Sequence, residues 1–410
     1  MSTMKSLSEK LMGEATRLTL GGKLAEATAA IQRALGLGEP QPSRRSGPPA
    51  GAAVAVLDGL GRELPQADTS LRREPSGTSS PPTTYRGAAA SPPATFEEDA
   101  YSAASGTRRY KLFVPAGFDD KALPLIVMLH GCTQSPDDFA AGTRMNDIAQ
   151  ESGFLVLYPA QAPRSNSSKC WNWFVPGDQK RGAGEPELLA GLTRHIMGMH
   201  RVDPNRVFVA GLSAGGAMAD ILGREYPDLY AAVGVHSGLP QGAAHDIASA
   251  LAAMQGGGAT SMLGRVASNG RSGQAREGPT TGAAPDRAAP PTIVFHGDRD
   301  ATVHPSNGEQ VIGAVIGAIS AGSDVVASSE RAAAAGRAAT RTVHRRSRAT
   351  PAEPSLAEHW IVHGTGHAWS GGSSSGSYTE SAGPDASREM VRFFLEHPLP
   401  GTRLEPRRWF

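Results

Sequence analysis

Short apolar runs that alternate with helical patterns constrain the fold of this chain more than any other feature of its sequence. Leu125–Leu129 reads Leu-Ile-Val-Met-Leu without a polar residue, as expected for a strand that is buried on both faces of a parallel sheet. Further strands are expected at Tyr110–Val114, Leu155–Tyr158, Val207–Ala210, Ala231–His236, Thr292–His296 and His359–His363, and helices at Asp138–Glu151, Glu187–Met199, Ala214–Glu225, Ser306–Ile319 and Ser387–Glu396. This alternation predicts an α/β fold with a mostly parallel, doubly wound sheet. Right-handed crossovers then bring the carboxyl ends of the strands, and any site built on them, to one edge.

The segments around this body differ from it in composition. Residues 1–36 show apolar residues at helical spacing and predict a helical hairpin, which is either a docking or self-association element or an appendage packed on its own domain. Residues 37–95 are rich in Pro, Gly and Ser and predict a disordered linker, because they bury too little apolar surface to offset their ordering entropy. A catalytic domain is expected over 96–400 and a tail over 401–410. Two segments, 256–290 and 321–340, are expected as surface insertions, the first of them mobile.

Charge and hydropathy restrict the partners of the chain. Lys and Arg number 40 against 39 Asp and Glu, a net charge of +1, so no electrostatic footprint for nucleic acid follows. No run reaches the roughly 18 apolar residues of a membrane span. The first twenty residues also lack the unbroken apolar stretch of about 7–15 residues that a secretory signal needs. A cytoplasmic location is therefore expected. The 2 cysteines and scattered histidines show no metal-ligand spacing, and neither a metal nor another cofactor is expected.

A candidate nucleophile lies where one predicted strand meets a predicted helix. Gly211-Leu-Ser213-Ala-Gly215 follows the strand at 207–210 and opens the helix at 214–225, the context in which a G-x-S-x-G motif has meaning. The sharp turn exposes the Ser213 hydroxyl at the edge of the sheet, and the amides that begin the helix point at developing negative charge. The sequence therefore predicts Ser213 as the nucleophile and the Ala214 N–H as one oxyanion donor. The alternative is a structural turn, since such motifs arise by chance in Gly- and Ser-rich chains.

The acid and the base are expected in loops after later strands, in the order Ser, acid, His. Two carboxylates follow the strand at 292–296. Asp298 is placed to accept backbone amides, and Asp300, further into the loop, is placed to reach the next loop. His367 lies among glycines after the last strand and is the expected base, whereas His363, at the strand end, is expected to pack on the sheet. His236 and His296 also end strands and are expected to pack or to support the site.

Two further segments are expected to border the nucleophile. His130–Gln134 follows the first central strand, where the loop normally supplies the second oxyanion donor, and the Cys132 N–H is the expected one. Cys170–Phe174 is a dense aromatic patch. Its Trp173 is interpreted either as a wall for the acyl or alcohol group of a substrate or as ordinary packing. Whether Cys132 and the cysteine at 170 lie close enough for a disulfide depends on geometry alone.

Five motifs in order carry a resemblance: His130–Gln134, Cys170–Phe174, Gly211–Gly216, His296–Val303 and Gly366–Gly372. With them, roughly residues 101–397, apart from the two insertions, resemble the polyhydroxybutyrate depolymerase family of esterases, which is akin to the feruloyl and acetylxylan esterases. The resemblance implies an α/β-hydrolase fold and ester hydrolysis through an acyl-enzyme. It also implies a triad, two oxyanion amides and an aromatic wall at the residues assigned above: Ser213, Asp300, His367, Cys132, Ala214 and Trp173.

The chain also departs from this family in two respects. Many members are secreted and carry a substrate-binding module after a linker, whereas here neither a signal peptide nor room for such a module is evident. An extracellular location is therefore the alternative expectation. The expected substrates are polyhydroxybutyrate-type polyester, its oligomers or related short hydroxyacid esters. A feruloyl- or acetylxylan-type carbohydrate esterase is the second hypothesis, and a non-catalytic binding protein with the hydrolase fold is the alternative from another class.

Overall fold

The computed structural model describes residues 93–118, 121–256, 289–319, 324–332, 336–350 and 353–400. The chain divides into two units, residues 1–90 and 91–410, and the described residues all belong to the second. The hairpin expected at 1–36, the linker expected at 37–95 (except its last three residues) and the tail at 401–410 lie outside them. So does most of the first expected insertion, from 257 to 288.

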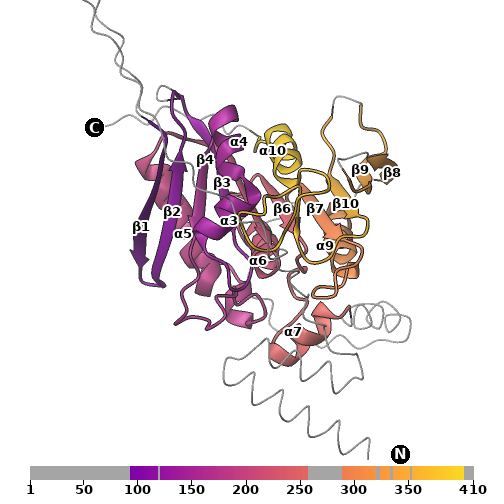
Figure 1. Cartoon of the computed structure of the whole chain (residues 1–410), viewed down its shortest axis with the longest axis horizontal. Helices are drawn as coiled ribbons and strands as arrows, with labels where there is room; N and C mark the ends of the chain where they lie inside the picture. The colour runs from indigo at the N-terminus through magenta and orange to yellow at the C-terminus, as the bar shows by residue number, and fades with distance from the viewer. Residues whose placement is uncertain are drawn as a thin grey trace, which may run out of the picture. The chain divides into compact units, whose positions relative to one another are not determined.

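A ten-stranded sheet forms the framework, in the order β1-β2-β4-β3-β5-β6-β7-β10-β9-β8 (Figure 1). The strands are β1 (Thr95–Ala103), β2 (Gly106–Val114), β3 (Leu123–Leu129), β4 (Leu155–Pro159), β5 (Val202–Leu212), β6 (Ala232–His236), β7 (Thr292–Gly297), β8 (Val325–Ala332), β9 (Ala339–Arg346) and β10 (Ala357–Val362), and a small second sheet pairs β11 (Trp369–Ser370) with β12 (Thr379–Glu380). The six strands from β4 to β10 are parallel, and antiparallel strands flank them on both sides. The mostly parallel sheet predicted from the unbroken apolar runs is confirmed.

Helices cover both faces of the sheet, as a doubly wound fold requires. They are α3 (Pro136–Thr143), α4 (Met145–Ser152), α5 (Gly184–Met199), α6 (Ala214–Glu225), α7 (Ile247–Met254), α9 (Ser306–Ile319) and α10 (Ala386–Glu396), with a 3₁₀ turn, η1, at Pro176–Gln179. Adjacent residues of β6 show the two faces: Val233 lies against Gly223 of α6, whereas Gly234 lies under Met390 of α10. Helices α4 and α10 contact each other on the second face (Figure 1). On that face Phe208 of β5 stacks on Phe394 of α10, with ring centroids 5.0 Å apart.

Three local features differ from the sequence expectation or were absent from it. The single helix predicted over Asp138–Glu151 is wrong: Arg144 adopts a left-handed backbone (φ 55°) and separates α3 from α4. The Ala/Ser-rich segment at 321–340 contributes β8 and the start of β9, an antiparallel hairpin at the edge of the sheet. Helix α7, capped by Asp246 and Ser249, was not predicted either.

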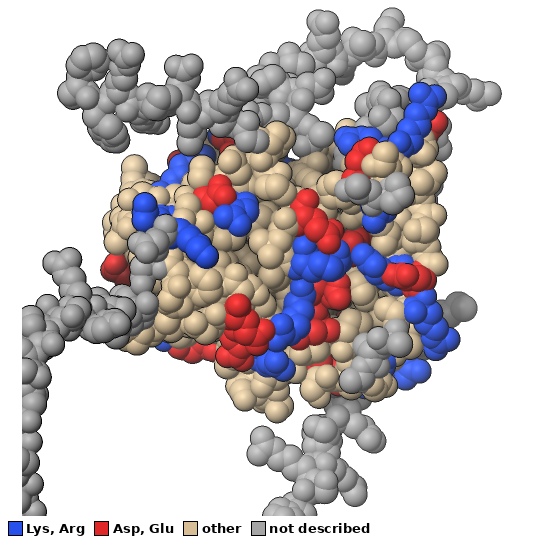
Figure 2. Space-filling model, turned by 90° about the horizontal axis from the view of Figure 1, so that it is seen from above, with Lys and Arg blue, Asp and Glu red and all other residues tan. Residues whose placement is uncertain are grey.

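The described surface and helices bear on possible partners. On the face shown in Figure 2, Lys and Arg side chains lie interspersed with Asp and Glu side chains, with uncharged residues between them. That face therefore presents no extended area of one charge. Among the helices of the described residues, none is both long enough and apolar enough to cross a bilayer.

Candidate active site

Ser213 occupies a strained turn between β5 and α6. Its backbone lies at φ 57° and ψ −120°, a combination that costs energy for a residue with a side chain. The flanking glycines make the turn possible. A Cβ on Gly211 would lie 2.7 Å from the carbonyl oxygen of Leu129 in β3, and a Cβ on Gly215 would lie 2.1 Å from the same oxygen. The G-x-S-x-G sequence thus forms the sharp strand-to-helix turn that was predicted.

Asp300 and His367 form a buried hydrogen-bonded pair. Nδ1 of His367 lies 2.7 Å from Oδ2 of Asp300, with side-chain exposures of 11% and 0%. Oδ1 of Asp300 accepts the N–H groups of Thr302 (2.9 Å) and Val303 (2.8 Å). Burial raises the pKa of Asp300, but hydrogen bonds from His296 and His367 outweigh it and hold the pKa below its ordinary value. An ionised Asp300 accepts the hydrogen bond from the Nδ1–H group of His367, which leaves Nε2 as the basic atom of the ring.

Two buried histidines support this pair and the serine turn. His296 donates from Nε2 to the carbonyl of Val303 (2.8 Å), and the same nitrogen lies 3.5 Å from Oδ2 of Asp300. The backbone carbonyl of His236 accepts the Ser213 N–H (2.9 Å), and Nε2 of the His236 ring accepts the Ser370 N–H (3.0 Å). Burial lowers the pKa of His236 well below its ordinary value, so the ring is neutral and can accept at Nε2. His236 thereby connects the serine turn to the loop that carries His367.

Asp298 and His363, the alternative candidates for the acid and the base, pair with each other instead. Nδ1 of His363 lies 2.9 Å from Oδ2 of Asp298, and their side chains are 41% and 37% exposed. Asp298 also accepts the Gly364 N–H at 2.7 Å, as expected for a residue placed to satisfy backbone amides. Nε2 of His363 lies 2.9 Å from Oγ1 of Thr340, so this ring is held by polar contacts rather than packed on the sheet as expected. These contacts anchor the start of the loop that carries His367.

Three of the four backbone N–H groups in the loop after β3, residues 131–134, donate to acceptors within the protein. Gly131 N–H donates to Oε1 of Gln134 (2.8 Å), Thr133 N–H to the carbonyl of Ser168 (2.7 Å) and Gln134 N–H to the carbonyl of Gly131 (3.3 Å). Within the described part of the chain, these contacts leave the Cys132 N–H as the one amide of residues 131–134 without an acceptor. Ala214 is the first residue of α6, where an N–H has no partner inside the helix. Both predicted oxyanion donors are thus available for a ligand.

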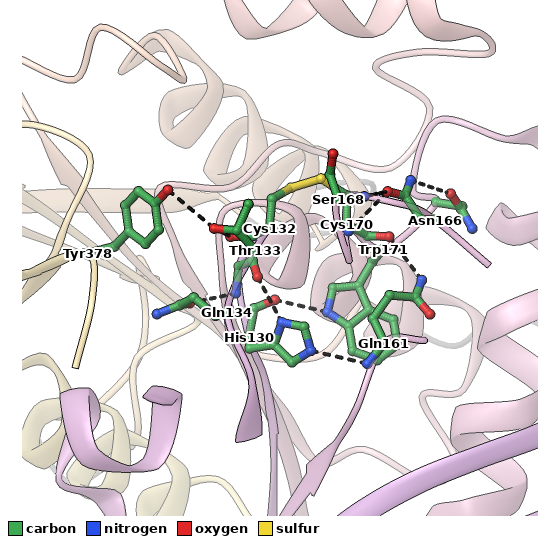
Figure 3. The surroundings of a disulfide bond; sticks show 12 residues. His130, Cys132, Thr133, Gln134, Gln161, Asn166, Ser168, Cys170, Trp171 and Tyr378 are labelled. Atoms are coloured by element: carbon green, nitrogen blue, oxygen red, sulfur yellow. Dashed lines mark hydrogen bonds between the residues drawn. A yellow bond between two sulfur atoms is a disulfide. The ribbon is translucent and has the colours of Figure 1, made fainter. Parts of the chain in front are cut away.

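A disulfide joins Cys132 to Cys170 and so answers a question that the sequence left open (Figure 3). It links the loop after β3 to the aromatic segment Cys170–Phe174. Below it, the carbonyl of His130 accepts the indole N–H of Trp171 (2.9 Å), and Nε2 of His130 accepts the Gln161 N–H (3.1 Å). Burial lowers the pKa of His130 to about 4, so its neutral ring can accept at Nε2 and donate from Nδ1 to the Gly131 carbonyl.

The aromatic segment is held from beneath by a buried ion pair that the sequence analysis did not identify. Glu185 accepts the Asn172 N–H (2.8 Å) and lies 3.4 Å from the guanidinium of Arg108, which also stacks over Trp171. Burial raises the pKa of Glu185 and lowers that of Arg108. Trp173 is buried, with 5% of the residue exposed, so most of its surface is in packing contacts.

A third loop, which carries Tyr378, was also missed. Nε2 of Gln134 donates to the carbonyl of Ser377 (3.0 Å) and to Oδ2 of Asp138 (2.9 Å), and Asp138 accepts the Ser377 N–H (2.9 Å). The loop after β3 is therefore connected on both sides, by a disulfide on one and by hydrogen bonds on the other. Within the described residues, no group of three or more His, Cys, Asp or Glu side chains is arranged to hold a metal ion.

This geometry can be compared with known proteins. A family model described as esterase PHB depolymerase matches residues 108–339, more than half of the chain. The chain belongs to the PHB depolymerase esterase family. Its matched region contains the Ser213 turn, the loop after β3 and Asp300, while His367 lies beyond it.

The curated proteins that this chain resembles include depolymerases and carbohydrate esterases. Poly(3-hydroxyalkanoate) depolymerase C of Paucimonas lemoignei is 35% identical over 201 residues, which cover 48% of this chain and 45% of the relative. Probable acetylxylan esterase A of Aspergillus fumigatus is 29% identical over 208 residues, covering 50% of this chain and 53% of the relative. The chain thus spans about half the length of the curated relatives it matches.

A solved structure supports the fold assignment. The acetyl xylan esterase from Aspergillus awamori aligns with a TM-score of 0.50 at 18% identity, over 73% of this chain and 99% of that chain. At this identity the likeness concerns the fold alone. The α/β-hydrolase fold expected from the sequence is confirmed.

Proposed function

We propose that this member of the PHB depolymerase esterase family is a serine-dependent carboxylic ester hydrolase that works through an acyl-enzyme. One observation carries the proposal: a buried, ionised Asp300 is bonded to Nδ1 of His367, while the loop of this histidine and the strained Ser213 turn both attach to His236. A strained nucleophile turn and an oriented imidazole are the parts that acyl transfer requires. A non-catalytic binding protein has no need of either.

The proposed reaction has two steps. Nε2 of His367 takes the hydroxyl proton of Ser213 as Oγ attacks the ester carbonyl, and the N–H groups of Cys132 and Ala214 stabilise the oxyanion. The imidazolium then protonates the departing alcohol, and the acyl group stays on Oγ. In the second step His367 deprotonates a water molecule that attacks the acyl-enzyme, and the acid leaves as Oγ recovers its proton. Asp300 stays ionised throughout and stabilises the imidazolium.

The proposed substrates are polyhydroxybutyrate-type polyester, its oligomers and related short-chain hydroxyacid esters. The sequence identity of 35% to a relative named as a poly(3-hydroxyalkanoate) depolymerase, from Paucimonas lemoignei, supports this class. A feruloyl- or acetylxylan-type carbohydrate esterase is the second candidate, supported by the Aspergillus fumigatus relative and by feruloyl esterase B of Thermothelomyces thermophilus, which is 33% identical over 140 residues. Trp173, 5% exposed, is proposed to line the substrate site.

Hydrolysis of p-nitrophenyl butyrate tests the activity. The Ser213→Ala variant is expected to lose turnover while its thermal unfolding stays unchanged. Ser374→Ala, at an exposed serine of the Gly-rich stretch 371–376, is the matched control and is expected to keep full activity. Retained turnover in Ser213→Ala overturns the assignment of the nucleophile. Rates on 3-hydroxybutyrate oligomers, amorphous polymer, acetylated xylan and feruloyl esters then separate the two substrate classes.

The disulfide bears on location. Disulfides persist in oxidising compartments and are rare in the cytosol. The Cys132–Cys170 bond therefore favours the extracellular alternative over the cytoplasmic expectation. Alkylation of free thiols at harvest, followed by mass spectrometry, tests this: two alkylated cysteines in the native protein would support the cytoplasm.

A further inference from the structure

Tyr378 lies beside the proposed catalytic centre and has no part in the chemistry described so far. Its ring meets the imidazole of His367 edge-on, with centroids 6.4 Å apart. Its hydroxyl is turned toward Thr133 of the loop after β3, with the two side-chain oxygens 3.4 Å apart (Figure 3). The residue is 47% exposed, one of the few large hydrophobic side chains at the surface of the described residues. An exposed aromatic ring at this place is within reach of a group bound next to the scissile ester.

The backbone of this tyrosine is held in an uncommon conformation. Its φ of 53° lies in the left-handed region, where a bulky side chain is rarely found without a reason. The surrounding contacts enforce it: the Tyr378 carbonyl accepts the Trp369 N–H (2.7 Å), and the preceding Ser377 is bound to both Gln134 and Asp138. The ring is thus presented toward the site by a fixed loop rather than by a mobile one.

The Tyr378 hydroxyl remains available as a hydrogen-bond donor. Thr133 uses its own hydroxyl proton in a 2.6 Å bond to the carbonyl of Cys132. The Tyr378 hydroxyl can donate to the Thr133 oxygen, but at 3.4 Å this contact is at the limit of a hydrogen bond. A better placed acceptor on a ligand would therefore replace it at little cost.

We propose that Tyr378 is a substrate-binding residue that selects hydroxyacid oligoesters, on the basis of the proposed function. Its ring packs on the substrate unit next to the scissile ester, and its hydroxyl donates to an oxygen of that unit, either the next ester carbonyl or a terminal hydroxyl. A simple alkyl ester has no such oxygen. The hydroxyl therefore discriminates between the two kinds of ester, whereas the ring serves both.

Two substitutions separate the hydroxyl from the ring. Tyr378→Phe is expected to lower kcat/KM for the 3-hydroxybutyrate trimer about tenfold, the loss expected for one neutral hydrogen bond, and to change kcat/KM for p-nitrophenyl butyrate by less than about twofold. Tyr378→Ala is expected to lower both. Tyr101→Phe, on the edge strand β1, is the matched control and is expected to change neither. Equal effects of Tyr378→Phe on the two substrates overturn the proposal.

A binding measurement keeps this result separate from the test of the proposed function. In the Ser213→Ala background, calorimetric titration with the trimer is expected to show about tenfold weaker binding after Tyr378→Phe. If the wild-type protein hydrolyses no ester, the proposed function fails, and an unchanged or undetectable affinity in this titration overturns the inference as well. If hydrolysis occurs but the affinity is the same in both variants, the role of Tyr378 alone is refuted.

Discussion

Exchanging Asp300 for Asn tests the identity of the proposed catalytic acid, and the same exchange at Asp298 is its matched control. In Asp300→Asn the side-chain oxygen still accepts the two loop amides that Oδ1 now accepts. The side-chain nitrogen, however, is a donor, and it faces Nδ1 of His367 across a distance of 2.7 Å in the native pair. Nδ1 must then become the acceptor, and the imidazole proton moves to Nε2. The atom that should take the Ser213 proton is thereby blocked.

The expected loss is large for one carboxylate and small for the other. A wrong imidazole tautomer lowers turnover by about 10⁴-fold in a well-studied triad, which corresponds to about 5.4 kcal/mol of transition-state stabilisation. Asp298 pairs with His363 where both side chains are more than one third exposed, and such pairs contribute little. Exchange of Asp298 for Asn is therefore expected to lower turnover by less than about fivefold. The assay is hydrolysis of p-nitrophenyl butyrate at neutral pH. Similar losses in the two variants, or more than about one tenth of native activity in Asp300→Asn, would refute the reasoning.

Three further outcomes are expected. Because the pKa of Asp300 is lower in the folded state than the unfolded value of about 3.9, its carboxylate stabilises the fold above that pH, and this contribution is lost as the pH falls below it. The difference in urea stability between wild type and Asp300→Asn should therefore shrink from about pH 7 to about pH 3, and a constant difference would contradict this. Gly215→Ala brings a Cβ within 2.1 Å of the Leu129 carbonyl and should cost about 3 kcal/mol of unfolding free energy or more, measured in urea. Replacing both Cys132 and Cys170 with Ala should cost about 4 kcal/mol for a separation of 38 residues, with kcat within about tenfold because the backbone N–H remains.

The inner strands could be predicted from the sequence because burial on both faces leaves no place for a polar residue. All seven residues of β3 and all six of β7 are buried. The edge strands gave no such signal, since most side chains of β8 and β1 are exposed and their sequences mix polar and apolar residues freely. The break at Arg144 was equally hidden, because a left-handed arginine between two short helices depends on packing rather than on local preference.

For the candidate site, the sequence could predict features of local geometry. The sharp turn at Ser213, which its own motif determines, belongs to this class. Contacts between distant segments could not be predicted, since nothing near His236 in the sequence indicates that it accepts hydrogen bonds from both residue 213 and residue 370. The choice of Asp300 over Asp298 rested on its reach across the loop, and the structure gives each carboxylate a different histidine. The disulfide depends on the approach of two loops, which the sequence does not determine.

Several of these long-range contacts meet at the Cys132 peptide, in the loop after β3, and the direction of its N–H group gives a physical reason for this. An N–H group stabilises an oxyanion strongly only when its direction is fixed before the reaction begins. On one side, the disulfide and the bond from Thr133 to Ser168 hold the Cys132 peptide. On the other side, Gln134 connects it to the loop of Tyr378. Loosening either side should therefore reduce turnover through the orientation of the Cys132 N–H, even though the cysteine sulfur takes no part in the proposed chemistry.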